Sequence, residues 1–82
     1  MTNNKACKCK ISELLNQLDI AQRQGLIQTY EHMPGHYQIH IILRQDHTQE
    51  MKDGLRRHIL KTYRDIIRAD IGSSWVNVEY EI

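Results

Sequence analysis

The sequence has little of several residues and patterns that mark particular classes of protein. Its 82 residues include no phenylalanine, one tryptophan and one proline. No apolar run approaches the roughly twenty residues that a membrane-spanning helix needs, and the opening residues MTNNKACKCK lack the apolar centre of a signal peptide. We therefore expect a cytoplasmic protein without a membrane partner.

Charge is nearly balanced. The formal net charge is +1, with 26% charged and 40% hydrophobic residues, and these are ordinary values for a globular protein. A chain of this length forms one domain with a small core. We expect a flexible tail containing lysine and cysteine over residues 1–10 and a single domain over residues 11–82. Any nucleic-acid site would be a local patch, because the protein is not basic overall.

The two cysteines, Cys7 and Cys9, lie one residue apart in the expected tail. A disulfide between them would close too short a loop to stabilise the fold, and together they supply only two of the four ligands of a structural zinc site. Reducible thiols in a tail are the simpler interpretation. The alternative is a metal-dependent dimer to which each copy contributes Cys7 and Cys9. The five histidines do not converge on one ion, and no cofactor is expected.

Residues Ile11 to Gln24 predict an amphipathic helix, since leucine and isoleucine recur there at three- and four-residue steps. Ser12 would cap its start, and Gly25 stands where a left-handed residue would end it.

From Leu26 to Arg44 the apolar period shortens to two residues, which predicts a hairpin. Pro34 and Gly35 suit the two central positions of a type II turn between the strands. The cross-strand pairs expected on the covered face are His32 with Tyr37, Tyr30 with Ile39, Gln28 with Ile41, and Leu26 with Leu43.

Residues Thr48 to Ile71 have the longest helical period in the chain. The expected apolar stripe consists of Met51, Leu55, Ile59, Tyr63, Ile66 and Ile67. Gly54 inside this helix would cost about 1 kcal/mol relative to alanine, so we expect its backbone to pack closely on a neighbour. The closing residues WVNVEYEI alternate in polarity and predict a half-buried final strand.

The elements thus run α-β-β-α-β. We predict an α+β fold in which two helices pack on one face of a three-stranded sheet. Such a sheet has two exposed edges, and the final strand is the candidate for pairing with a second copy of the chain.

The sequence does not predict an enzyme. Its serines lie near the ends of expected elements, and no nucleophile elbow or phosphate-binding glycine loop occurs.

The uncovered face of the expected sheet is the first candidate site. It would carry Trp75, Ile27 and Ile42, with Glu79 and Glu81 around them. An exposed tryptophan beside aliphatic residues and surrounded by charge is typical of an interface centre. The first hypothesis is therefore a non-catalytic binding or adaptor module that acts through protein contacts on this face and also associates with itself.

A row of cations on the expected long helix is the second candidate. Arg57, Lys61, Arg64 and Arg68 would lie on successive turns, a spacing that can follow a phosphate backbone. Neighbouring aspartates could neutralise part of this row. Binding of RNA or DNA through this basic face is the alternative hypothesis.

Overall fold

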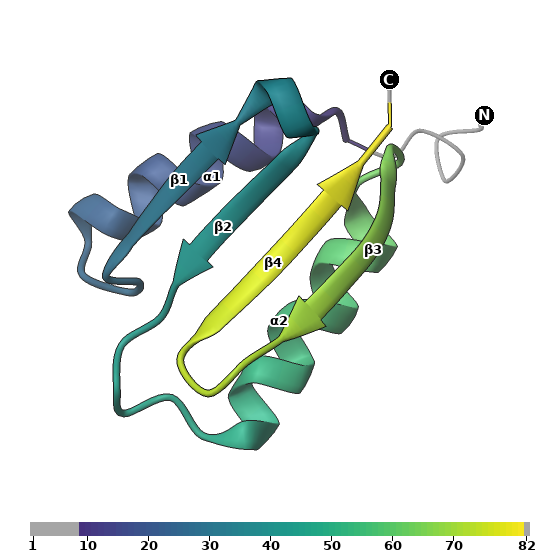
Figure 1. Ribbon diagram of the computed structural model, residues 1–82. Helices are drawn as coiled ribbons and strands as arrows, with labels where there is room; N and C mark the ends of the chain where they lie inside the picture. Colours follow the sequence, from purple (N-terminus) through teal and green to yellow (C-terminus); the bar gives the residue numbers. More distant parts are fainter. Residues whose placement is uncertain (1–8, 82) are drawn as a thin grey trace, which may run out of the picture.

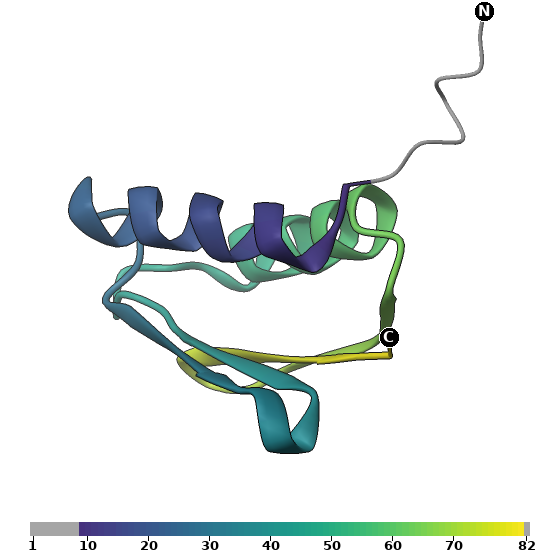
Figure 2. The same cartoon turned by 90° about the horizontal axis from the view of Figure 1, so that it is seen from above.

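The computed structural model describes residues 9–81 and has an α+β fold of two helices and a four-stranded antiparallel sheet. The elements are α1 (Ile11–Arg23), β1 (Thr29–Met33), the 3-10 turn η2 (Pro34–His36), β2 (Gln38–Ile42), α2 (Gln49–Thr62), β3 (Ile66–Ile71) and β4 (Trp75–Tyr80). Both helices cover one face of the sheet, and the other face is open (Figures 1 and 2). Within residues 9–81, neither helix has the length and apolarity to cross a membrane. The α+β class is confirmed, and the predicted sheet lacked one strand.

The strand order β1-β2-β4-β3 relates the two halves of the sheet by an approximate two-fold rotation. Each half of the chain supplies a helix followed by a hairpin, α1-β1-β2 and α2-β3-β4, and β2 pairs antiparallel with β4 in the middle. When the halves are aligned so that His40 matches Asn77, the helices and strands of the two halves coincide along the sequence. These two residues also face each other across β2 and β4. A pseudo-two-fold axis therefore passes between them.

Local signals account for two of the four helix ends, the end of α1 and the start of α2. Ser12 does not cap α1 as predicted, since the N-cap is Lys10 and makes no side-chain hydrogen bond. Gly25 has a φ of 76°, as predicted, and two hydrogen bonds close α1 behind it: Gly25 N donates to Gln22 O (3.1 Å) and Leu26 N donates to Ala21 O (2.9 Å). This is the Schellman arrangement. At the start of α2, the Thr48 side chain accepts a hydrogen bond from Met51 N at 3.1 Å.

The prediction of one helix through Ile71 is wrong, because α2 ends at Thr62. Tyr63 is extended, with φ −109° and ψ 125°, and the chain there is held by Cys9. Cys9 N donates to Thr62 O (2.9 Å), and Arg64 N donates to Cys9 O (3.1 Å). These two bonds replace the next helical turn, so residues 66–71 are free to form β3. Because β3 pairs with β4, β4 is an inner strand and is not available at an edge for a second copy.

The hairpin forms, but its register differs from the prediction. Met33 faces Gln38 as the last pair, so the connection has four residues, and Tyr37 within it is left-handed with a φ of 54°. His32 therefore faces Ile39, and Tyr30 faces Ile41. The shift is two residues, which leaves every strand side chain on its predicted face.

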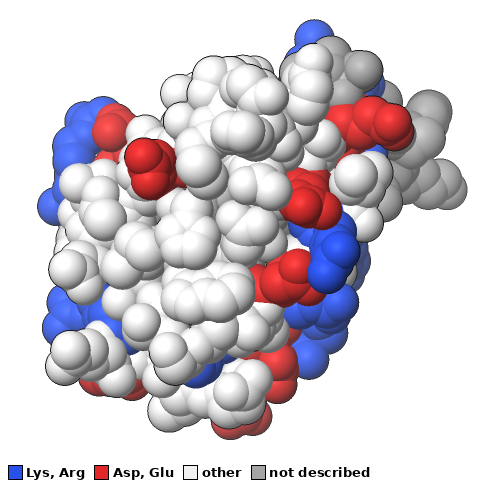
Figure 3. Space-filling model, in the orientation of Figure 1, with Lys and Arg blue, Asp and Glu red and all other residues white. Residues whose placement is uncertain are grey.

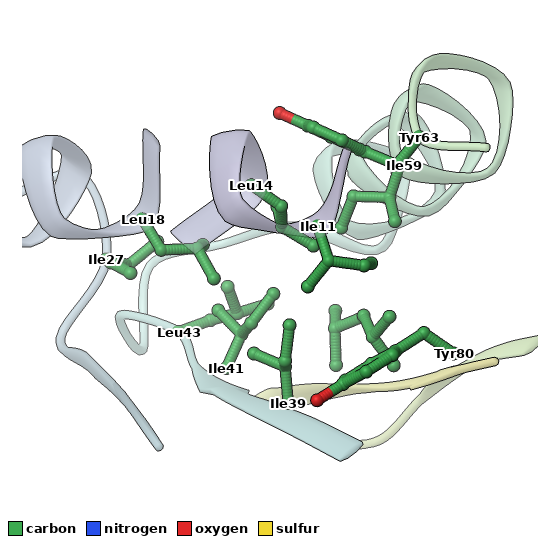
Figure 4. Close-up of a cluster of buried hydrophobic side chains, with 12 residues drawn as sticks. Ile11, Leu14, Leu18, Ile27, Ile39, Ile41, Leu43, Ile59, Tyr63 and Tyr80 are labelled. Carbon is green, nitrogen blue, oxygen red and sulfur yellow. The ribbon is translucent and has the colours of Figure 1, made fainter. Parts of the chain in front are cut away.

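The core lies between the sheet and the helices (Figure 4). Buried side chains from alternate positions of β2 and β4 meet those of α1 and α2: Ile39, Ile41, Val76, Val78, Leu14, Leu18 and Ile59. Ile27 belongs to this core and not to the open face, because β1 begins only at Thr29. The prediction for Gly54 is wrong. Its backbone does not pack closely on a neighbour, since nothing lies within 4 Å of a Cβ placed there.

Candidate functional site

The open sheet face is defined by the strand residues that alternate with the core. In register, they form three rows across the sheet. The rows are Thr29-Ile42-Trp75, Glu31-His40-Asn77-Asp70 and Met33-Gln38-Glu79-Arg68. All but Glu31 and Arg68 are half-buried, although no helix covers them. We use the name open sheet face for these eleven residues.

Trp75 and Ile42 form the apolar part of this face. They are direct cross-strand partners on β4 and β2. The indole also covers Gly72, since a Cβ at Gly72 would overlap the ring. On its other side lies the His40 imidazole, with ring centroids 5.4 Å apart and an interplanar angle of 31°. The indole is thereby held against the sheet with part of its surface exposed.

Polar side chains beside the indole are paired with one another. His40 Nδ1 and Asn77 Oδ1 are hydrogen-bonded at 3.2 Å, with the imidazole N–H donating to the amide oxygen. Gln38 Nε2 donates to Glu79 Oε2 at 3.1 Å. Cross-strand bonds of this kind fix the rotamers of an exposed surface, so the face is largely preorganised for a partner.

The charges on this face are mainly negative and lie at its margins. Figure 3 shows a largely uncharged surface over the sheet, with both acidic and basic groups around it. Arg68 is the only cation among the eleven residues, and its Nε lies 2.9 Å from Asp70 Oδ2. This ion pair leaves Glu31 and Glu79 as the acidic groups without a basic partner on the face.

The predicted interface residues are only partly brought together. Trp75, Ile42 and Glu79 lie on the open sheet face, and Glu81 is exposed just beyond the end of β4. Ile27 is buried with 7% exposure on the helix side, so the predicted contact of Ile27 with Ile42 does not form. Thr29 faces Ile42 in its place.

The predicted row of cations is divided among three elements. Arg57 and Lys61 lie on α2, Arg64 lies in the turn after it, and Arg68 lies on the open side of β3. Asp65 lies 3.9 Å from Arg64 Nε. Because α2 ends before Arg64, only two of the four cations share a helical face.

The metal alternative, a dimer through Cys7 and Cys9, is not tested. Cys7 lies outside the described residues. Cys9 is exposed and free, and its backbone joins the start of the chain to the end of α2. Over residues 9–81, no group of three or more histidine, cysteine, aspartate or glutamate side chains is placed to hold a metal ion.

A groove between α1 and α2 was not predicted from the sequence. Its volume is about 310 Å³. It is lined by Leu14, Gln17, Leu18, Ala21, Leu26, Ile27, His47, Met51, Leu55, His58, Ile59 and Tyr63. None of these carries a permanent charge, and Nδ1 of His47 is buried without a hydrogen-bond partner among the described residues. The apolar periods of the two helices predict that both face the core, but not that they leave a groove between them.

Comparisons with known proteins found no matching family model, no matching curated protein and no matching solved structure. A function for this chain is therefore inferred from the surfaces described above.

Proposed function

We propose that this protein is a non-catalytic binding module whose open sheet face takes a protein partner. The observation that carries the proposal is the position of Trp75. The indole is held between Gly72 and His40 and is paired with Ile42 on a sheet face that no helix covers. A rigid, partly exposed tryptophan with an aliphatic neighbour and a polar surround is the usual composition of an interface hot spot.

The charges favour a partner with lysine or arginine around its contact surface. Glu31 and Glu79 flank the uncharged centre, and Arg68 is occupied by Asp70. Such a margin attracts a cationic protein surface and repels a phosphate backbone. Binding should accordingly weaken as salt is raised.

The experiment is capture of the partner by the immobilised full chain from host lysate, with and without nuclease, followed by binding measurements on the retained protein. Trp75→Ala should weaken its binding by about tenfold or more, and Glu31→Lys with Glu79→Lys should weaken it in a salt-dependent way. Thermal unfolding of each variant shows whether the fold is kept.

Two matched controls separate this surface from others. Leu26→Ala removes an exposed aliphatic side chain from the helix side, where Leu26 is 58% exposed, and should leave binding unchanged. Arg57→Glu with Lys61→Glu should also leave it unchanged. If these helix variants abolish binding and the sheet variants do not, the proposal is wrong. Nuclease-sensitive recovery with that pattern would favour the nucleic-acid alternative.

A further inference from the structure

The groove between α1 and α2 exists because the two helices pack on different strands. α1 packs on β1, and α2 packs on β3. Figure 2 shows both helices on the same side of the sheet. Cys9, just before α1, is bonded to the end of α2, so Leu14 and Tyr63 line the same end of the groove. Leu26 and Met51 line the other end, which is the open one.

The dimensions of the groove limit what it can hold. Its volume of about 310 Å³ lies at the lower end of the range for small-molecule sites and equals the space of about ten water-sized groups. The two turns of α1 from Leu14 to Ala21 give it a length of about 10 Å. Its mean width is then about 6 Å, which admits a hydrocarbon chain or a single ring but not a helix of roughly 10 Å diameter.

The walls of the groove favour an uncharged, largely apolar ligand. Leu14, Leu18 and Ile59 are among the lining residues, none of which carries a permanent charge. A charged ligand would lose its hydration there without gaining a counter-charge. At the open end, Leu26 is 58% and Met51 is 51% exposed, and the apolar part of a ligand would cover some of this surface.

Tyr63 supplies a polar group at the closed end. It is 5% exposed and lines the groove. In Figure 4 its ring extends from the end of α2 toward α1, with the hydroxyl at the far end. The hydroxyl of Tyr80 is bonded to His32, whereas no group among residues 9–81 bonds that of Tyr63. A buried hydroxyl normally has a partner, so whatever occupies the groove must supply one.

The Tyr63 hydroxyl is a donor at neutral pH, because burial raises the pKa of this tyrosine above its usual value. His47 Nδ1 is also unpaired in the groove wall. That nitrogen has less than 1 Å² of exposed surface, so it is not a contact for a ligand. The polar end of a ligand should accordingly lie at Tyr63.

We propose that this groove binds a small uncharged molecule of about ten non-hydrogen atoms, apolar along most of its length, with a carbonyl or hydroxyl oxygen that accepts a hydrogen bond from Tyr63. Its apolar end lies toward Leu26 and Met51. The groove is on the helix side of the sheet, opposite the open sheet face, and the inference does not rest on the partner assigned to that face.

The test uses 2-octanone, a neutral chain of this size with one carbonyl group, and amide NMR spectra of the purified full chain. Adding 2-octanone should shift the amide signals of Leu14 to Ala21 and of Leu55 to Tyr63 until they saturate. The amides of Glu31 and Asp70 on the outer strands should not move. Octanoate has a chain of the same length but a negative charge, and should bind more weakly by about tenfold or more.

Three variants locate the site. Ala21 is half-buried in the groove wall, so Ala21→Leu fills the space and should weaken binding by about tenfold or more while thermal unfolding stays as in the native protein. Asn16→Leu is the matched control, because Asn16 is exposed on α1 outside the groove, and should leave binding unchanged. Tyr63→Phe keeps the ring but removes the donor, and should weaken binding by about threefold to tenfold.

The proposal is overturned if 2-octanone shifts no amide along the groove, or if the shifts grow without saturation and extend to the outer strands. It is also overturned if octanoate binds as tightly as 2-octanone, or if Ala21→Leu binds as well as Asn16→Leu. Equal binding by Tyr63→Phe and the native protein would overturn the assigned hydrogen bond.

Discussion

The indole of Trp75 rests directly on the backbone of Gly72, where a Cβ would overlap the ring. Gly72→Ala should therefore displace the indole and lower the free energy of unfolding by about 1–3 kcal/mol. Chemical denaturation measures the loss. Because Trp75 is the only tryptophan, a red shift of its fluorescence reports the displacement. An unchanged emission spectrum together with unchanged stability would contradict the contact.

Alanine at Gly54 should stabilise the fold, in contrast to alanine at Gly72. This residue lies inside α2, and nothing is within 4 Å of a Cβ placed there. Gly54→Ala should raise the free energy of unfolding by about 0.5–1 kcal/mol, because alanine favours the helix and has room for its methyl group. Gly54→Ala and Gly72→Ala make the same chemical change at two sites, and chemical denaturation measures the free energy of unfolding of both variants.

Lys52 connects the first turn of α2 to the turn between β3 and β4. It is 7% exposed, and its Nζ donates to Ser73 O at 2.8 Å and to Gly72 O at 3.3 Å. Lys52→Met keeps the aliphatic stem but removes both donors, and should cost about 1–3 kcal/mol of stability. Faster amide exchange should appear first around Gly72. Equal exchange in variant and native protein would show that the ammonium does not hold this turn.

Alkaline pH should destabilise the fold through two buried tyrosines. Burial raises the pKa of Tyr80 and of Tyr63 above the usual value of 10.0, so above that pH the unfolded chain loses these protons first. The stability that these two tyrosines contribute is then fully present below pH 10 and is lost as the pH rises through their higher pKa values in the folded state. Tyr63→Phe should reduce the slope of stability against pH in this window. It is the cleaner variant, because Tyr80 also bonds His32 Nε2 through its hydroxyl at 2.6 Å.

Elements with their own local signals could be predicted from the sequence. The first helix ends where Gly25 permits a left-handed residue. The faces of the hairpin were also predictable, because the alternation of apolar residues survives a shift of two positions. Ile42 lies on its predicted face for this reason, and Trp75 does so because its own strand, β4, alternates in polarity.

The end of α2 could not be predicted in the same way. No glycine or proline marks it, and Ile66 and Ile67 continue the helical spacing of Ile59 and Tyr63. What ends the helix is a contact with Cys9, which is distant in sequence. The β-branched residues in IIRADI and the short turn after them were the available signals for a second hairpin. Because IIRADI was predicted as helix, Arg57, Lys61, Arg64 and Arg68 were expected in one row. The fold divides them among three elements.

The approximate two-fold symmetry of the sheet bears on whether further chains could add at its edges. A sheet whose halves are alike has two alike borders, and if both could join a neighbour, chains would add without end. The borders differ in side chains. Glu31 and Met33 on β1 occupy the positions that Arg68 and Asp70 occupy on β3. Antiparallel pairing of two β1 strands about His32 would set the Glu31 carboxylate of one chain against the Met33 thioether of the other. That contact would strip water from a charge without supplying a counter-charge. At the other border, Ala69 on β3 is 1% exposed and its carbonyl accepts a hydrogen bond from Arg56. Growth of the sheet into a ribbon of chains is accordingly opposed at both borders.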